Sequence, residues 1–130
     1  MKKILAILAA TGWISVSEFT RNQVLFNLYW TAHYKGLGLT FPSAPINGVM
    51  WGLWSFIFAI AIFIISRRFS LIEGGLLAWL MAFVMMWVAI GNLGVLPLGL
   101  LWYAVPLSLI ESFVAIWIIR KLSAPEPIDH

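Results

Sequence analysis

The stretch 44–66, APINGVMWGLWSFIFAIAIFIIS, decides the fold because it is long, apolar and free of charged side chains. A helix that rises 1.5 Å per residue needs about 20 such residues to cross a hydrocarbon core of about 30 Å. Pro45 falls in the expected first turn, where a missing N–H breaks no hydrogen bond, and Ser43 precedes it as a candidate N-cap. The stretch therefore predicts a transmembrane helix.

Three further spans are indicated by the charge-free runs on either side of this helix, which cover 4–17, 74–110 and 112–119. With the turn residues between them, these runs predict helices over about 4–27, 71–90 and 97–119. Ser70 and Glu73 have the spacing of a capping box at the start of the third helix. We predict an all-α, polytopic membrane protein with four transmembrane helices in an antiparallel bundle, forming one domain over 1–121 with a flexible tail over 122–130.

The composition supports lipid as the solvent and excludes several kinds of chemistry. Of the 130 residues, 62% are hydrophobic and 10% are charged, whereas soluble domains carry about 25% charged residues. The absence of cysteine excludes disulfides, thiolate metal sites and thiol catalysis. The net charge is +3, but the basic residues are scattered in ones and twos, so we expect no nucleic-acid partner.

Motifs for catalysis or cofactor binding are also missing from the sequence. It contains no catalytic triad, phosphate-binding loop or zinc motif. Met81 and Met85 have the spacing of soft copper(I) ligands, but methionine more often fills packing gaps in apolar helices. We therefore predict that the chain is not an enzyme and binds no metal or cofactor.

The orientation follows from the basic residues near the ends of the expected spans. If the four helices alternate in direction, six of these residues fall on one side, which the positive-inside rule makes cytoplasmic: Lys2, Lys3, Arg67, Arg68, Arg120 and Lys121. The opposite side carries rings that suit a headgroup belt: Tyr29, Trp30, Tyr34, Trp51, Trp54, Trp87, Trp102 and Tyr103. We expect a multi-pass protein of the bacterial inner membrane with both termini in the cytoplasm.

The first span has two features that need separate interpretation. Its basic start and short apolar run also fit a cleavable secretory signal, but no small-x-small cleavage site follows, so we predict an intact helix. The segment 21–35 combines helical apolar spacing with Asn22, Gln23 and Asn27, which are too polar for open lipid. We expect this segment to continue the first helix through a kink or an interfacial turn, with its outer half among headgroups.

Three charged residues lie well inside the expected spans, where charge is costly and side chains turn toward the bundle interior or a cavity: Glu18, Arg21 and Glu111. The helical rise puts Glu18 about 21 Å and Glu111 about 13 Å from the cytoplasmic boundary. Two carboxyl groups at similar depth suggest a proton or cation relay, in which Arg21 holds Glu18 ionised and Glu111 takes up the proton. The alternative is a polar cluster that only fixes the register of the helices.

The last helix surrounds Glu111 with small and polar side chains. Ser108 shares its face and Tyr103 lies one face over, so both are candidates for the same pathway. Pro106 removes a backbone N–H and leaves the carbonyl of Trp102 free. Such a kink can line a cavity, but small residues equally permit close helix packing.

Two stripes of small residues predict helix contacts. Gly48 and Gly52 form a GxxxG motif, while Gly75, Ala78 and Ala82 form a stripe on the third helix. We expect both stripes to pack against helices of the same chain. We also expect a homo-oligomer or a complex with other membrane subunits, because four short helices enclose little volume.

The sequence resembles small uncharacterised four-helix bacterial integral membrane proteins in its first and fourth helices. The residues that carry this resemblance are Trp13, Glu18, Phe19, Asn22, Leu107, Glu111, Val114, Ala115, Arg120 and Lys121. The architecture is also similar to that of the small multidrug resistance transporters, which are four-helix dimers with a glutamate in the first helix. This chain departs from them because Glu18 lies toward the outer end and Glu111 has no counterpart, so their mechanism is not transferred.

These features lead to two hypotheses of different kinds. The first is a small dimeric transporter or channel, linked to protons or cations, that uses Glu111, Glu18 and Arg21 with Ser108 and Tyr103 nearby. The second is a non-catalytic accessory subunit or assembly factor that docks other membrane helices. The sequence leaves the substrate or ion open.

Overall fold

The computed structural model describes residues 1–124, and all regular structure within this range is helical. This confirms the all-α prediction. Most of the expected tail, residues 125–130, lies outside the described residues, while Leu122 still belongs to the last helix.

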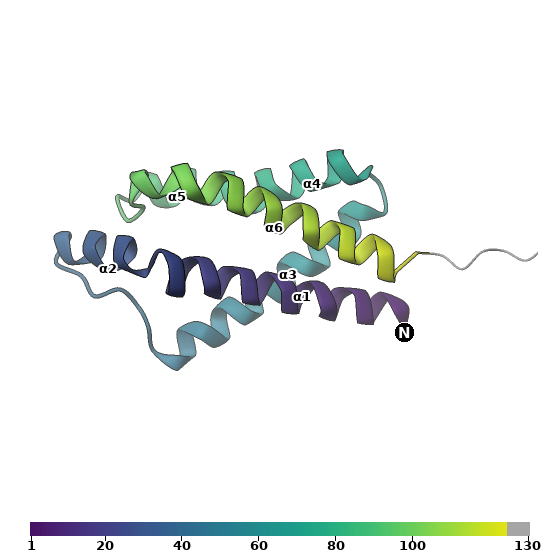
Figure 1. Cartoon of the computed structure of the whole chain (residues 1–130), viewed down its shortest axis with the longest axis horizontal. Helices are drawn as coiled ribbons and strands as arrows, with labels where there is room; N and C mark the ends of the chain where they lie inside the picture. The colour runs from purple at the N-terminus through teal and green to yellow at the C-terminus, as the bar shows by residue number, and fades with distance from the viewer. Residues whose placement is uncertain (125–130) are drawn as a thin grey trace, which may run out of the picture.

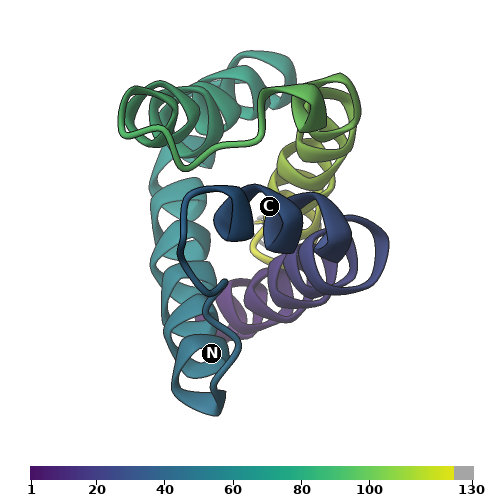
Figure 2. The same cartoon turned by 90° about the vertical axis from the view of Figure 1, so that its left-hand side faces the viewer.

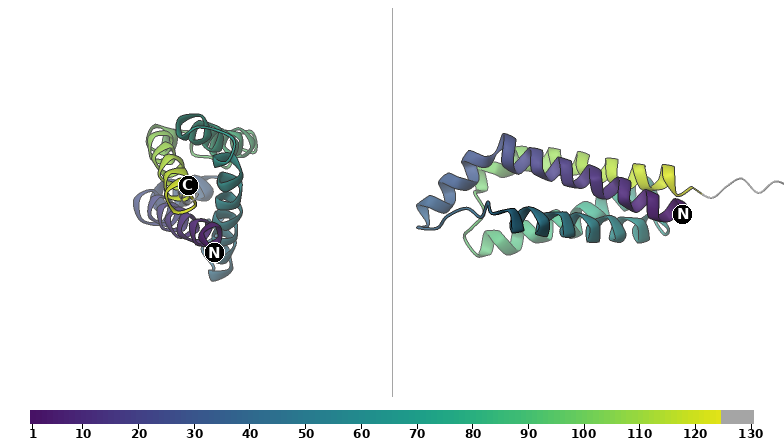
Figure 3. Two further views of the ribbon diagram at one scale, coloured as in Figure 1. Left: turned by 90° about the vertical axis from the view of Figure 1, so that its right-hand side faces the viewer. Right: turned by 90° about the horizontal axis from the view of Figure 1, so that it is seen from below.

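The first helix, α1 (Lys2–Phe19), continues without a break into a π-helical segment, η1 (Thr20–Leu25). Phe26 then leaves helical geometry, with φ −122° and ψ 17°, and α2 (Asn27–Gly36) begins. The chain bends between the two helices (Figure 3). The segment 21–35 is therefore helical on both sides of a kink at Phe26, and this kink lies between the polar residues Gln23 and Asn27.

The remaining helices match the expected spans closely. A loop over 37–44 leads to α3 (Pro45–Ser66), with Pro45 at its first position. After a tight turn, Ser70 accepts a hydrogen bond from the backbone N–H of Glu73 at 3.1 Å and begins α4 (Leu71–Trp79). This helix runs through the π-helical η2 (Leu80–Val84) into α5 (Met85–Asn92). A turn at Gly94 and a short 3₁₀ segment, η3 (Leu98–Leu100), precede α6 (Leu101–Leu122).

Within residues 1–124, four helical stretches are long and apolar enough to cross a membrane: Lys2–Leu25, Pro45–Ser66, Leu71–Asn92 and Leu98–Leu122. The first has the lowest mean hydropathy, 1.2 against 2.3 for the second. The first stretch carries Lys2, Lys3, Glu18 and Arg21, whereas the second carries no charged side chain.

Successive stretches run in opposite directions, so the start of α1, the α3–α4 turn and the end of α6 lie at one end of the molecule (Figure 1). We call this the basic end, because it carries Lys2, Lys3, Arg67, Arg68, Arg120 and Lys121. Arg120 joins two of these elements by donating to the carbonyl of Phe69 at 3.0 Å. At the opposite end, α2 lies in front of the space between the four stretches (Figure 2). We call this the α2 end.

The core lies toward the basic end and is built from small and branched side chains. Helix α1 packs against α3 and α6, and α6 also packs against α4. The fully buried alanine and isoleucine members of this core are Ala6, Ala10, Ile14, Ala59, Ile62, Ala115, Ile116 and Ile119, and Phe83 is its fully buried aromatic member. Alanine at these positions lets the backbones approach closely.

The two stripes of small residues differ in their surroundings. A Cβ added to Gly75 would lie 2.7 Å from the ring of Phe113 on α6, and Ala78 and Ala82 pack in the same core. A Cβ added to Gly48 or Gly52 would meet nothing within 4 Å. The expected contact of Gly48 and Gly52 with another helix of the chain is therefore wrong, because the first half of α3 diverges from α1 (Figure 1) and its first buried residue is Ser55.

Candidate functional site

The centre of the molecule holds an ion cluster of Glu18, Arg21 and Glu111. Arg21, in η1, donates through Nη2 to Oε1 of Glu18, one turn earlier. Its Nη1 lies 3.5 Å from Oε1 of Glu111 on α6. Glu18 is 4%, Arg21 6% and Glu111 0% exposed, so one guanidinium serves two carboxyl groups away from solvent. The structure thus brings together the three ionisable residues that the sequence singled out.

Amide and indole groups hold this cluster in place. Asn22 donates through Nδ2 to Oε2 of Glu18 at 3.0 Å and accepts at Oδ1 a 3.0 Å hydrogen bond from the Trp30 indole of α2. Trp13 donates to the backbone carbonyl of Glu111 at 3.0 Å and so joins α1 to α6. The roles of Trp13 and Trp30 could not be recognised in the sequence, because each depends on a contact between two helical segments. Asn22 could have been recognised, since position i+4 from Glu18 lies on the same helical face.

Arg21 also rests on an aromatic surface that comes from the other π-helical segment. The carbon of its guanidinium lies 5.2 Å from the ring centroid of Phe83 in η2, within the range of a cation–π interaction. Phe83 is fully buried, and its ring centroid lies 5.9 Å from those of Trp54, Phe58 and Trp87. Single π-turns inside α-helices are frequent at functional sites. Here a residue of one π-helical segment, Arg21 of η1, contacts a residue of the other, Phe83 of η2.

The two carboxyl groups differ in their hydrogen bonding. Both oxygens of Glu18 accept hydrogen bonds, one from Arg21 and one from Asn22. Oε1 of Glu111 has the long contact to Arg21, and its Oε2 makes no hydrogen bond of standard geometry among residues 1–124, although the side chains of Ser17 and Glu18 lie near this carboxyl group. A buried polar atom without a partner is costly, and more so when it carries charge. Glu111 is therefore the less stabilised anion of the two.

Two of the predicted pathway residues lie outside this cluster. The hydroxyl of Ser108 donates to the carbonyl of Val105 at 3.0 Å and accepts from the Trp79 indole at 2.9 Å, so it ties α6 to α4. Tyr103 is half exposed and stacks on Phe26 at 5.5 Å between ring centroids. Neither side chain is among the described hydrogen-bond partners of Glu111. Their part in a pathway with Glu111 therefore stays a prediction.

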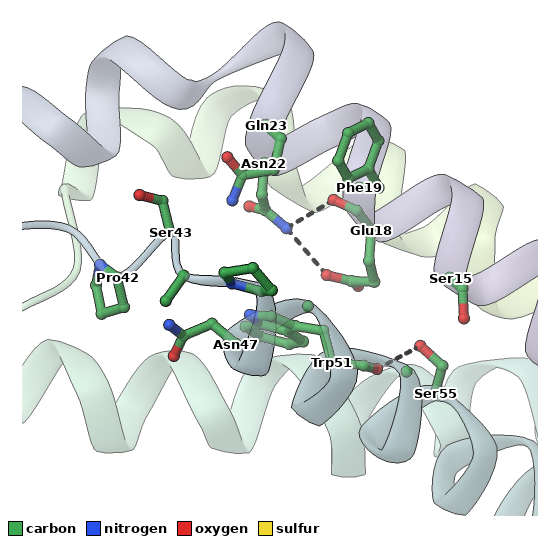
Figure 4. A pocket seen from close by; sticks show the side chains of 14 residues that line it. Ser15, Glu18, Phe19, Asn22, Gln23, Pro42, Ser43, Asn47, Trp51 and Ser55 are labelled. Atoms are coloured by element: carbon green, nitrogen blue, oxygen red, sulfur yellow. Dashed lines mark hydrogen bonds between the residues drawn. The ribbon is translucent and has the colours of Figure 1, made fainter.

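A cavity of about 410 Å³ opens beside Glu18, between the end of α1 and the diverging first half of α3 (Figure 4). We call it the first cavity. Glu18, Asn22 and Gln23 face it from one side, and Asn47, Trp51 and Ser55 face it from the other. The loop residues Pro42 and Ser43 border it toward the α2 end. Gly48 and Gly52 line the same space, which explains why they contact no helix.

A second cavity of about 260 Å³ reaches the same cluster from the interior of the bundle. Glu18, Asn22 and Gln23 line both cavities, whereas Arg21 lines only the second. The second cavity has six aromatic lining residues, which come from α2, the 37–44 loop, α3, η2 and α5: Trp30, Tyr34, Phe41, Trp51, Phe83 and Trp87. Phe41 stacks on Trp30 at 5.7 Å between ring centroids, which fixes the loop over this cavity. Glu18 therefore stands where the two cavities adjoin.

Metal ligands are sparse around these cavities. Within residues 1–124, no group of three His, Cys, Asp or Glu side chains is placed to hold a metal ion. His33 donates to the carbonyl of Gly94 at 2.8 Å and so connects α2 to the turn before η3.

Comparisons with family models, with curated proteins and with solved structures found no match to this chain.

Proposed function

We propose that the chain is an integral membrane protein that crosses the bacterial inner membrane four times and keeps both termini in the cytoplasm. Four helices of sufficient length and apolarity support the number of crossings. The gathering of Lys2, Lys3, Arg67, Arg68, Arg120 and Lys121 at the basic end supports the orientation, since cytoplasmic flanks are enriched in lysine and arginine. The α2 end then faces outward.

We infer that this protein is a transporter linked to protons or cations, and the ion cluster is the observation that carries this function. With both carboxyl groups ionised, the cluster has one positive and two negative charges in a buried site. A proton on one of the two carboxyl groups makes the whole cluster neutral. Low dielectric and the repulsion between two carboxylates both favour that proton.

Glu111 is the group that takes the proton in this proposal. Each carboxylate oxygen of Glu18 already accepts a hydrogen bond. Glu111 has one long contact to Arg21, and its Oε2 makes no hydrogen bond of standard geometry. Buried carboxyl groups inside membrane helices commonly mark proton and ion pathways. The arrangement therefore assigns Glu18 the role of fixed anion and Glu111 that of proton carrier.

The cavities support access from the outer side. Both lie beside the cluster toward the α2 end, while the half of the molecule near the basic end is filled by the core. In this proposal, the cluster is reached from the outer side in the present state. Transport then requires a second state in which the basic half opens.

The test is proton flux through the protein reconstituted in liposomes. Vesicles that enclose a pH-sensitive dye are given an inward pH gradient, with valinomycin and potassium setting the membrane potential. We expect Glu111→Gln to reduce the flux to the level of protein-free vesicles, because glutamine cannot carry the proton. Glu73→Gln, which alters an exposed carboxyl group, is the matched control and should leave the flux unchanged. Wild-type flux in Glu111→Gln would refute the proposal.

The open face of Gly48 and Gly52 favours a second candidate function, that of an accessory subunit. Small residues at this spacing let another helix approach closely, and here no helix of the chain does so. A second copy of the chain or a different membrane protein would fit the same face. Purification of the tagged protein with one partner in fixed stoichiometry would favour this candidate.

A further inference from the structure

Helices α4 and α6 pack along a seam that ends at the basic end of the molecule. From the basic end inward, four contacts set the antiparallel register of this seam: Phe69 with Arg120, Gly74 with Ile116, Gly75 with Phe113 and Trp79 with Ser108. Gly74 and Gly75 are buried and have no side chain, which lets the two backbones approach closely. The guanidinium of Arg120 is therefore held at the end of the seam, beside the turn that begins α4.

The outer side of the α4–α6 seam presents apolar side chains. The buried residues of both helices, which include Gly74, Ala78, Ser112 and Ile116, mark the faces that turn inward. On the other side, Ile72 is 66% and Leu76 47% exposed on α4, while Ile110 is 55% and Trp117 51% exposed on α6. From Ile110 to Arg120 the helical rise gives about 15 Å. A hydrocarbon chain can lie along this side, below the guanidinium.

Basic side chains surround the end of the seam. Arg120 uses Nη1 to reach the carbonyl of Phe69, and within residues 1–124 its guanidinium makes no other hydrogen bond. Arg68 is exposed in the α3–α4 turn and Lys121 follows Arg120, and neither side chain has a partner in the described part of the chain. They outnumber the nearby acid Glu73, which is exposed in the first turn of α4. A positive patch therefore adjoins the apolar side of the seam.

This combination matches the two parts of an anionic phospholipid. Guanidinium groups bind phosphate through paired N–H···O hydrogen bonds, and Arg120 has donors to spare. Basic pockets between transmembrane helices on the cytoplasmic side bind lipid headgroups. An acidic segment of another protein would match the charge, but it would leave the apolar side of the seam uncovered. A lipid covers both.

We propose that the outer side of the α4–α6 seam binds one anionic phospholipid, with its phosphate at Arg68 and Arg120 and an acyl chain along Trp117. In the proposed orientation, this lipid belongs to the cytoplasmic leaflet. The inference rests on the membrane insertion stated in the proposed function, but it does not use the transport step.

The experiment measures the quenching of tryptophan fluorescence by lipids that carry bromine on an acyl chain, which quench the rings that they contact. The full chain is reconstituted in phosphatidylcholine vesicles that contain a small, equal fraction of brominated phosphatidylglycerol or brominated phosphatidylcholine. The ratio of the two quenching constants gives the preference for the anionic lipid. We expect a preference of at least about fivefold, the factor that one basic residue near a membrane surface contributes.

Tryptophan variants locate the bound lipid. Trp117→Phe should lose the additional quenching by brominated phosphatidylglycerol, because Trp117 lies one turn before Arg120. Trp102→Phe is the matched control, because it removes a more exposed ring near the other end of α6, and it should keep this additional quenching. Additional quenching that survives in Trp117→Phe would overturn the placement of the lipid on this seam.

Charge variants separate a defined site from diffuse surface charge. Arg120→Gln and Arg68→Gln should each reduce the preference about fivefold. Arg68→Gln keeps the hydrogen bond to Phe69, so it tests the site even if Arg120→Gln does not fold. Lys3→Gln removes the same charge from an exposed position of the basic end, but on α1, and should leave the preference unchanged. An equal reduction by Arg68→Gln and Lys3→Gln would refute the site.

Soluble glycerol 3-phosphate distinguishes a lipid from a free phosphate ester. It should not displace brominated phosphatidylglycerol, because it has no acyl chain to lie along the seam. Displacement would overturn the assignment to a lipid.

The same vesicles separate the failure of this inference from the failure of the proposed function. Equal quenching by the two brominated lipids would overturn the lipid site and leave the proton-flux test of Glu111 unaffected. If neither brominated lipid quenched the fluorescence, the chain would not be inserted in the bilayer, and the proposed function would fall together with the lipid site.

Discussion

Replacing Arg21 with glutamine removes the positive charge that two buried carboxyl groups share. Water cannot stabilise the remaining negative charges in place of the guanidinium, since Glu18 is 4% and Glu111 0% exposed. Removing one partner of a buried ion pair typically destabilises a protein by about 3–5 kcal/mol, because the remaining charge is left uncompensated. We expect Arg21→Gln to lower the free energy of unfolding by this amount at pH 8.5.

The loss of stability caused by Arg21→Gln should be smaller at lower pH. Protonation removes the uncompensated charge of a buried carboxyl group, and burial without a counter-charge favours the protonated form relative to the unfolded chain. The folded variant therefore binds more protons than its unfolded form, and its free energy of unfolding falls as the pH rises. One extra proton over three pH units corresponds to about 4 kcal/mol at most, which is comparable to the whole penalty. We expect the deficit at pH 5.5 to be no more than half of that at pH 8.5.

The assay is unfolding in mixed micelles by increasing dodecyl sulfate, followed by circular dichroism and tryptophan fluorescence at both pH values. Arg68→Gln, which alters an exposed arginine of the α3–α4 turn, is the control and should change the free energy of unfolding by less than about 0.5 kcal/mol. The double variant Arg21→Gln with Glu18→Gln should regain at least half of the lost stability at pH 8.5. An equal deficit at both pH values, or no recovery in the double variant, would contradict the electrostatic explanation.

Two further substitutions test the packing on which the site depends. Gly75→Ala should lower the free energy of unfolding by about 1–3 kcal/mol in the same assay, because the new Cβ would lie 2.7 Å from Phe113. Gly48→Ala, which meets open space, should cause no loss, so an equal effect of the two would be inconsistent with the packing described. Trp13→Phe should cost about 1 kcal/mol through the lost hydrogen bond to Glu111, with Trp102→Phe, at an 86% exposed position, as the nearly neutral control.

Features that depend on neighbours along the chain could be predicted from the sequence. The expected helix over 44–66 corresponds to α3, and the spacing of Ser70 and Glu73 gave the start of α4. Arg21 reaches Glu18 because both lie on one face of a continuous helix. Helix starts and pairs one turn apart depend only on residues close together in the chain. Backbone geometry and residue type are therefore enough to predict them.

Features that depend on how helices approach one another could not be predicted. The two stripes of small residues look alike in the sequence, but only the stripe with Gly75 meets a neighbouring helix. Ser108 shares a face with Glu111, but its hydroxyl is engaged by Trp79 of another helix. The two π-helical segments leave no mark in composition, although they bring Arg21 and Phe83 together.

A single stripe along α1 explains why the molecule is closed at one end and hollow at the other. Ala6, Ala10, Ile14 and Glu18 follow one another every four residues, and all four are buried. The alanines allow close contact with α3 and α6, and Ile14 completes the apolar seal one turn before Glu18. Beyond Glu18, the stripe passes into the widened turn of η1, where the ion cluster and both cavities begin. Because the seal and the carboxyl group occupy adjacent turns of one rigid helix, opening the basic half would require α1 to move as a unit, and Glu18 would move with it.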